Sequence, residues 1–239
     1  MHNAIIIFGG RSSEDYGLRI SRDPDIIHAK RKIKVYSVDG RNGNIIFPEN
    51  AWENYDQTYE IYAVNTDDEV QKEGAAIAEW LNGLSGYQVL EDSYEPDYFR
   101  LAYYSGSLNM TNRFSRLGKA NIIFSCRPER FLKNGMNEIT ISSTGRSIFN
   151  PSDHAARPLI KVNGTASGSV TIGSNTMQID TITDYLWIDC EEMEVYRGAN
   201  ENRNSAVRGN FFSLEPGDST ITFTGGISSL VITPRWWII

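Results

Sequence analysis

The run Ile160-Lys161-Val162-Asn163 alternates apolar and polar side chains, which is typical of a β-strand that buries one face. The same alternation recurs through the rest of the chain, with turn-forming residues between the runs. These further runs are Val170–Ile172, Met177–Ile179, Leu186–Cys190, Ile221–Phe223 and Leu230–Ile232. Six or seven short strands within about 85 residues predict an antiparallel β-sandwich of the jelly-roll type for residues 150–239.

The preceding residues, 1–149, combine strand-like runs with one helix. Apolar residues recur at the helical period, and this stripe predicts a helix over about residues 67–84, with Trp80 beside the stripe in the core. The stripe consists of Val70, Gly74, Ile77, Leu81 and Leu84. The segment 133–151 is rich in Asn, Gly, Ser and Thr, so we expect the domain boundary at its end, between residues 149 and 150. The fold class is therefore mainly β with one helix.

The segment Pro48–Gln57 is polar and aromatic and has no strand or helix period of its own. It lies between two strand-like runs and is too long for a tight hairpin turn. We therefore interpret this segment as an extended arm.

Composition excludes several classes of protein. The chain has 239 residues, 40% of them hydrophobic and 22% charged, with 12 Tyr, 10 Phe and 5 Trp, as in a folded protein. The longest apolar run, Ala4–Phe8, is too short to span a membrane, and the first residues do not form a secretory signal. The net charge of −7 is spread over both halves, so nucleic acid is not an expected partner. The basic cluster Lys30–Lys34 is either a solvated strand edge or an interface.

No residue pattern indicates a metal or a cofactor. Cys126 and Cys190 are far apart and are expected to be buried thiols. His2, His28 and His154 have no metal-ligand spacing. Phe8–Arg11 has the glycines of a phosphate loop but lacks its Gly-Lys-Ser/Thr end.

An acidic cluster offers the best material for carboxylate chemistry. Its members are Asp184, Asp189, Glu191, Glu192 and Glu194. A glycosidase needs two carboxyl groups that face each other across a cleft, and a calcium site needs converging oxygens. We interpret the cluster as a solvated acidic hairpin tip, with a calcium site or a hydrolase as the alternatives. We expect no catalytic residue and no enzymatic activity.

Three tryptophans are candidates for contact with a sugar or a partner protein. They are Trp187, Trp236 and Trp237. Exposed indoles would serve such contacts, whereas buried ones would close the end of the sandwich. A carbohydrate-binding module that attaches to a host surface is thus the second hypothesis for function.

The order of several motifs resembles the distal tail proteins of siphophages, a tail-component family of long non-contractile phage tails. The motifs run from an early Gly-Arg-Asn-Gly turn, through a Trp-Leu helix end and a Phe-x-Cys-x-Pro stretch, to a Pro-Gly turn in the sandwich. The matching passages are Val38–Asn44, Glu79–Leu81, Pro96–Tyr103, Ile123–Pro128, Asn150–Pro151 with Ala156–Val162, and Leu214–Ser219. Asp39 stands where the family often has Pro, and Ser219 where Asn is frequent.

This resemblance implies a structural virion protein at the tip of a phage tail, assembled in the host cytoplasm. The N-terminal domain would form a closed ring of six copies, with an extended hairpin that wraps the neighbouring copy. The ring would bind the tail tube protein on one side and a tail-tip or baseplate protein on the other. The C-terminal domain would be a galectin-like sandwich that sometimes carries receptor-binding proteins.

Overall fold

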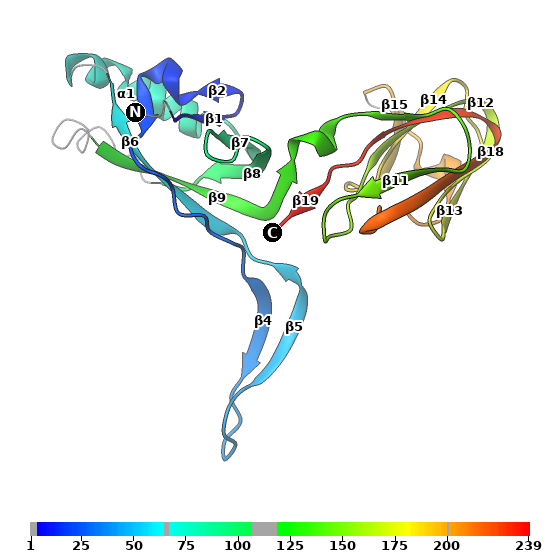
Figure 1. Ribbon diagram of the computed structural model, residues 1–239, viewed down its shortest axis with the longest axis horizontal. Helices are drawn as coiled ribbons and strands as arrows, with labels where there is room; N and C mark the ends of the chain where they lie inside the picture. The colour runs from blue at the N-terminus through cyan, green and yellow to red at the C-terminus, as the bar shows by residue number, and fades with distance from the viewer. Residues whose placement is uncertain (1–3, 65–66, 107–118, 200) are drawn as a thin grey trace. The chain divides into compact units, whose positions relative to one another are not determined.

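The computed structural model describes residues 4–64, 67–106, 119–199 and 201–239, with only the backbone for 67–73. The chain divides into two compact units. Unit 1 comprises residues 1–130 with Ile239, and unit 2 comprises Phe131–Ile238. Figure 1 shows the elements of both, and each unit is described by itself.

Unit 1 is built on a curled antiparallel sheet with the strand order β2–β1–β7–β8–β9–β6–β3. A separate two-stranded sheet, β4–β5, lies outside this order. The amide of Ile20 on β3 donates to the carbonyl of Ala4, just before β1, over 2.9 Å, so the two ends of the curled sheet approach each other. The elements are β1 Ile6–Phe8, β2 Arg11–Ser12, η1 Ser13–Tyr16, β3 Leu18–Ile20, β4 Arg31–Tyr36, β5 Ile45–Trp52, β6 Tyr55–Ala63, α1 Asp67–Asn82, β7 Gln88–Asp92, β8 Tyr98–Tyr104 and β9 Lys119–Leu132.

Helix α1 closes the core of unit 1, as its apolar stripe predicts. Ile77, Trp80 and Leu81 are buried, and the Trp80 indole N–H donates to the carbonyl of Phe8 over 3.0 Å. The helix ends at Asn82, so Leu84 lies beyond it and is 39% exposed; its place in the buried stripe is a wrong prediction. The side chain of Val70 lies outside the described residues. The helical period thus predicted the helix correctly but placed its end two residues too late, at 84 instead of Asn82.

A buried network of charged groups joins the strands of unit 1. The Asp92 carboxylate accepts hydrogen bonds from the Tyr59 hydroxyl at 2.7 Å and from Arg100 Nη1 at 3.2 Å. Arg100 also forms an ion pair with Glu95. Glu95 forms a second ion pair with Arg130, with 2.6 Å between Oε1 and Nη1. Burial and the neighbouring Asp92 charge raise the pKa of Tyr59 well above its usual value. These paired charges fix β6, β7, β8 and β9 against one another.

Unit 2 is an antiparallel β-sandwich made from one sheet that folds over itself. The N-terminal half of β12 pairs with β14, and its C-terminal half pairs with β13. β18 pairs with β12 along its length and adds β10 at one end and β11 at the other. The elements are η2 Lys133–Met136, β10 Ile139–Ile141, β11 Arg146–Asn150, β12 Leu159–Ile172, β13 Asn175–Ile179, β14 Tyr185–Asp189, β15 Glu194–Arg197, β16 Glu201–Asn202, η3 Asn204–Ala206, β17 Val207–Arg208, β18 Gly217–Thr233 and β19 Trp237–Ile238.

Glycines let β12 and β18 bend from one layer of the sandwich into the other. The pairing register shifts between Asn163 and Gly168. A Cβ atom on Gly168 would lie 2.3 Å from the carbonyl oxygen of Thr224, and one on Gly225 would lie 2.3 Å from that of Ser167. Gly225 and Gly226 lie within the single long strand β18, where its pairing with β12 shifts in register.

The mainly β fold class is confirmed, with an N-terminal β-rich unit, a hairpin arm and a C-terminal β-sandwich. The two units divide at Arg130 and Phe131, whereas the sequence suggests residues 149 and 150. The intervening residues contain β10 and β11, which pair with β18 of the sandwich. Of their Asn, Gly and Ser residues, those at 142–145 form the turn between β10 and β11, whereas Ser147 and Asn150 lie in β11 itself.

Candidate functional site

The hairpin arm, residues 31–52, is the part of unit 1 that has no core of its own. Its strands β4 and β5 pair only with each other among the described strands, and every residue of β4 is exposed. The expected position of the arm was right only in part, because Pro48–Trp52 belongs to its returning strand β5, but Tyr55–Gln57 belongs to β6 of the curled sheet. Figure 1 shows β4 and β5 as a separate ribbon.

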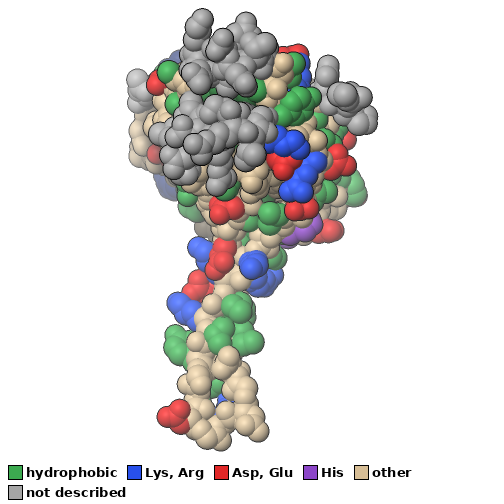
Figure 2. Space-filling view, turned by 90° about the vertical axis from the view of Figure 1, so that its left-hand side faces the viewer, with side chains coloured by type: hydrophobic (Ala, Val, Ile, Leu, Met, Phe, Trp, Pro, Cys, Tyr) green, Lys and Arg blue, Asp and Glu red, His purple; other side chains and the backbone are tan. Residues whose placement is uncertain are grey.

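Both faces of the hairpin arm carry apolar side chains. The register places Val35 opposite Ile46 and Ile33 opposite Pro48, which gives one aliphatic face. On the other face, the rings of Tyr36 and Phe47 meet edge to face at 5.7 Å. Figure 2 shows these hydrophobic side chains gathered along the arm.

The exposure of these side chains is unusually high for apolar residues. Ile46 and Phe47 are 59% and 54% exposed, and Ile33 and Val35 are each 49% exposed. A two-stranded hairpin is marginally stable by itself in water. A contiguous apolar surface of this kind marks an interaction site.

Polar contacts and a tight turn hold the arm in shape. Lys34 and Glu49 form an ion pair across the strands at 2.8 Å. The hydrogen bond from Lys34, followed by its charge, lowers the pKa of Glu49. At the tip, Gly40 and Gly43 have φ values of 78° and 80°, which residues with a side chain rarely adopt.

The root of the arm is anchored in unit 1. Trp52 is half-buried and packs against the core, and the Arg31 guanidinium lies 5.0 Å from the centre of its ring. Asn54 follows the arm and donates a 2.7 Å hydrogen bond to the Tyr87 hydroxyl. These contacts fix where the arm leaves the curled sheet.

The arm is basic, whereas the chain is acidic. Residues 31–52 contain four Lys and Arg against two Asp and Glu, a net charge of +2. The whole chain carries −7. The basic cluster Lys30–Lys34 lies mostly on β4, next to exposed apolar residues. This position favours an interface over a solvated strand edge.

The three candidate tryptophans have different surroundings in unit 2. Trp236 is buried in the core at 5% exposure. Trp237 is half-buried, stacks on His154 at 4.3 Å and donates to the carbonyl of Ala155. Trp187 is half-buried on β14, on the side of the strand away from the core. Only the last of these three presents a ring on the outer face of a sheet.

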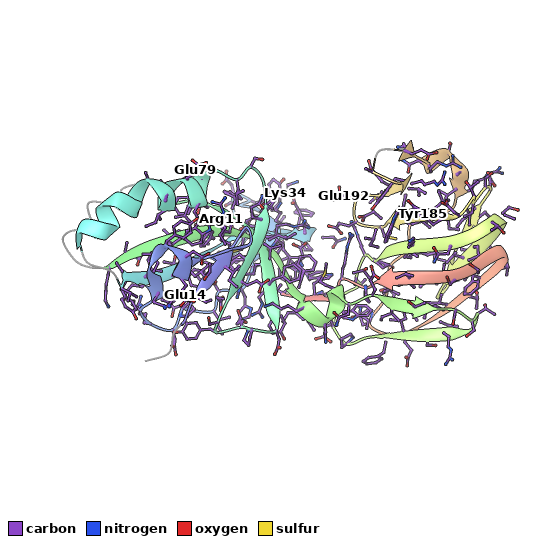
Figure 3. All side chains as sticks on the ribbon, turned by 90° about the horizontal axis from the view of Figure 1, so that it is seen from above. Arg11, Glu14, Lys34, Glu79, Tyr185 and Glu192 are labelled. Carbon is purple, nitrogen blue, oxygen red and sulfur yellow. The ribbon has the colours of Figure 1, made fainter. Side chains whose placement is uncertain are left out.

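Trp187 belongs to an aromatic and cationic cluster. The ammonium of Lys161 lies 4.6 Å from the centre of the Tyr185 ring and 5.6 Å from that of Trp187. Arg197 lies 5.9 Å from the Tyr185 ring and pairs with Asp184 at 2.9 Å. Figure 3 labels Tyr185 on the ribbon of this unit.

The acidic cluster has structural partners. Arg235 makes two hydrogen bonds to Asp189, of 2.8 and 2.9 Å, and Asp189 also accepts from the backbone amides of Glu191 and Glu192. Burial would raise the pKa of Asp189, but the hydrogen bonds and charge of Arg235 outweigh it and the pKa is lowered. Glu192 lies in the turn after β14 (Figure 3).

The remaining chemical candidates are not brought together. Cys126 and Cys190 are buried free thiols, as predicted, and burial raises the pKa of each to about 12. His28 is exposed, His154 packs on Trp237, and His2 lies outside the described residues. Within the described ranges, no group of three His, Cys, Asp or Glu side chains could hold a metal ion. None of the helices described is long and apolar enough to cross a membrane.

Three solved structures that match this chain are a phage hub protein and two phage baseplates. The SPP1 Dit protein is described as a paradigm of the hub adsorption apparatus in phages that infect Gram-positive hosts. It matches with a TM-score of 0.73 at 12% identity, over 96% of this chain and 97% of that chain. The chain shares the fold of the SPP1 Dit protein.

Two phage P2 baseplate structures, in the activated conformation with Ca and with Sr, also match. Their TM-scores are 0.53 and 0.52, at 9% and 8% identity, and each match covers 96% of this chain and 97% of the other. No protein-family model and no curated protein matches the sequence. The resemblance to siphophage distal tail proteins is thus confirmed at the level of fold.

Proposed function

We propose that this protein is a structural hub of a phage tail, in which copies of the chain join through their hairpin arms into a ring. The observation that carries the proposal is the hairpin arm, whose two faces carry apolar side chains that the described residues of its own chain leave exposed. The shared fold with a Dit hub protein supports the same role.

A ring is the closed outcome of such an arm. The arm is a different surface from whatever it binds on the next copy, so the contact is heterologous, and a heterologous contact closes into a ring when the rotation permits. The family resemblance supports six copies, with a tail tube protein on one side and a tail-tip or baseplate protein on the other. In this proposal the protein is a virion component, assembled in the host cytoplasm, and works without catalysis or a cofactor.

The oligomeric state of the purified full-length chain tests this proposal. Size-exclusion chromatography with light scattering is expected to give roughly 160 kDa for six chains of 26.9 kDa. The double variant Ile46→Asp/Phe47→Asp places one charge on each apolar face of the arm and is expected to leave monomers. A chain that is monomeric at every concentration would contradict the proposal.

Phe149 provides the matched control for the arm variant. It is 61% exposed, more than Phe47, but it lies on β11 of unit 2. Phe149→Asp therefore adds one charge at an exposed phenylalanine outside the arm, as Phe47→Asp does within it, and is expected to leave the ring intact. Loss of the ring in both variants would show that charge alone, and not the arm, controls assembly.

A second candidate function rests on the cluster around Trp187. An aromatic ring face beside polar side chains is what a sugar-binding site requires. Trp187 and Tyr185 supply the rings, and Asn163, on the same side of the neighbouring strand, donates to the Ser229 hydroxyl at 3.0 Å. We propose carbohydrate binding by unit 2 as an addition to the hub role.

Glycan-array binding of the full-length chain tests the second candidate. Trp187→Ala is expected to abolish the strongest signals, because a stacking platform is removed, while Trp187→Phe is expected to retain part of them. Trp237→Phe serves as the control, since that indole packs on His154. An array without signals would overturn this candidate and leave the hub proposal intact.

A further inference from the structure

A second apolar surface lies on the outer side of the curled sheet in unit 1. Tyr87, Val89 and Tyr103 are 43%, 39% and 42% exposed, and Leu101 is half-buried beside them. We call these four residues the tyrosine face. Because side chains alternate along a strand, they lie on the side of β7 and β8 opposite the buried Leu90 and its neighbours in the core.

The tyrosine face is fixed in place by contacts within unit 1. Val89 is opposite Leu101 in the β7–β8 register. The rings of Tyr87 and Tyr103 meet at 5.5 Å with an angle of 67° between them. The Tyr87 hydroxyl accepts the hydrogen bond from Asn54. A rigid surface of aromatic and aliphatic side chains loses little conformational entropy when it binds.

The exposed large apolar side chains fall into a few groups among the described residues. The arm and the segment before it hold most of them: Ile26, Ile27, Ile33, Val35, Tyr36, Val38, Ile46 and Phe47. The rest of unit 1 has the tyrosine face, with Leu84 and Val64. Unit 2 has Met136, Phe149 and Met193. The tyrosine face is therefore the group outside the arm whose members contact one another and present a continuous surface.

We propose that the tyrosine face receives the hairpin arm of a second copy of this chain. This inference rests on the proposed ring, since a heterologous contact needs a donor surface and a separate acceptor surface on every copy. The arm is the donor. The tyrosine face is an acceptor of matching character, because edge-to-face packing of aromatic rings suits Tyr36 and Phe47.

Charge favours the same pairing. The hairpin arm, residues 31–52, carries +2, while the other residues of 1–130 carry 17 Asp and Glu against 11 Lys and Arg, a net charge of −6. Glu91 lies on the same side of β7 as Val89, and Asp56 is exposed on β6 beside the root residue Asn54. A basic arm therefore meets an acidic neighbour, and opposite charge guides such an encounter.

The tyrosine face also adjoins the root of its own arm. Asn54 connects the two, because it follows β5 and bonds to Tyr87. An arm that docks on this face lies beside the point where the next arm begins. Repeated around a ring, this arrangement forms a continuous band of arms, in which each docked arm contacts the root of the arm of the copy that receives it.

Crosslinking between two single-cysteine variants tests the acceptor. Full-length Phe47→Cys or Ile46→Cys is mixed with Tyr103→Cys and treated with a short bismaleimide. The native thiols are buried, with their pKa raised to about 12, so they give little background. We expect a crosslinked dimer from at least one arm variant, and none when Phe149→Cys replaces Tyr103→Cys.

Assembly of a face variant gives the second readout. Val89→Asp/Tyr103→Asp is expected to weaken association about tenfold or more, equal to about 1.4 kcal/mol, while circular dichroism shows an intact fold. Tyr103→Phe is expected to assemble normally. If the wild type forms a ring, yet neither arm variant crosslinks to Tyr103→Cys and the face variant assembles normally, the acceptor proposal is overturned. A wild type that never forms a ring would instead overturn the hub proposal.

Discussion

The hairpin arm and the β12–β18 pair are both antiparallel strand pairs with alternating apolar residues, yet they bury their side chains differently. In β12 and β18, Ile160, Val162, Leu230 and Ile232 are fully buried within unit 2. In the arm, Val35 and its partner Ile46 are 49% and 59% exposed. The comparison teaches that an apolar strand pattern specifies burial but does not say which chain provides the cover.

Leu230→Ala is expected to produce the largest loss of stability. Leu230 is fully buried between the layers of the sandwich, and truncation of a buried leucine costs about 3 kcal/mol through lost contacts and a cavity. Urea unfolding followed by tryptophan fluorescence measures the change. A loss below about 1 kcal/mol would contradict the description of β12 and β18 as core strands.

Asp189→Asn is expected to have an intermediate effect of about 2 kcal/mol, because it weakens the two hydrogen bonds from Arg235. The native pair also predicts a pH dependence. The pKa of Asp189 is lowered from 3.8 in the folded state. The pair therefore stabilises the fold above that pH and loses its effect as the pH falls through the lowered value.

Urea midpoints measured between pH 7 and pH 3 check this sign. The urea midpoint of the wild type is expected to be higher than that of Asp189→Asn at pH 7, and this difference is expected to disappear as the pH falls below about 4. Asp153→Asn, at an exposed carboxylate, is the control. If the urea midpoints of the wild type and Asp189→Asn change with pH in parallel, the ion-pair account is contradicted.

Phe47→Ala is expected to have the smallest effect on the folded chain. Its ring is 54% exposed, so the free energy of unfolding of the dilute monomer should change by about 0.5 kcal/mol or less. Assembly should nevertheless weaken, because the ring is proposed to be buried by a second copy. Sedimentation velocity over a range of concentrations measures assembly. If the variant is stable and still assembles like the wild type, Phe47 does not lie in the interface.

The sequence predicted the parts of the fold that depend on local pattern. The helix with Trp80 in the core and the C-terminal sandwich strands follow from their periods, since both bury an apolar stripe within their own unit. The arm was predicted at Pro48–Gln57, and only the first half of this segment lies in the observed arm, residues 31–52. The strand β4 was not recognised as part of the arm, because its pattern is that of any half-buried strand. Its exposure depends on whether other parts of the fold pack over it, which no local pattern encodes.

The candidate residues show the same limit. Gly225 lies inside β18 although a glycine pair is a turn signal, because it lets two long strands approach each other closely. Trp236 and Trp237 are adjacent in sequence, yet one is buried in the core and the other stacks on His154. The tyrosine face was missed because its residues come from β7, β8 and the residue before β7, and only the register brings them together.

Electron microscopy of the purified full-length protein, with the Ile46→Asp/Phe47→Asp variant beside it, tests the central claim most directly. The account predicts closed rings of six copies for the wild type and single particles of about 27 kDa for the variant. Wild-type particles that are monomers or open filaments, or rings that persist in the variant, would contradict the claim that the hairpin arm joins the copies.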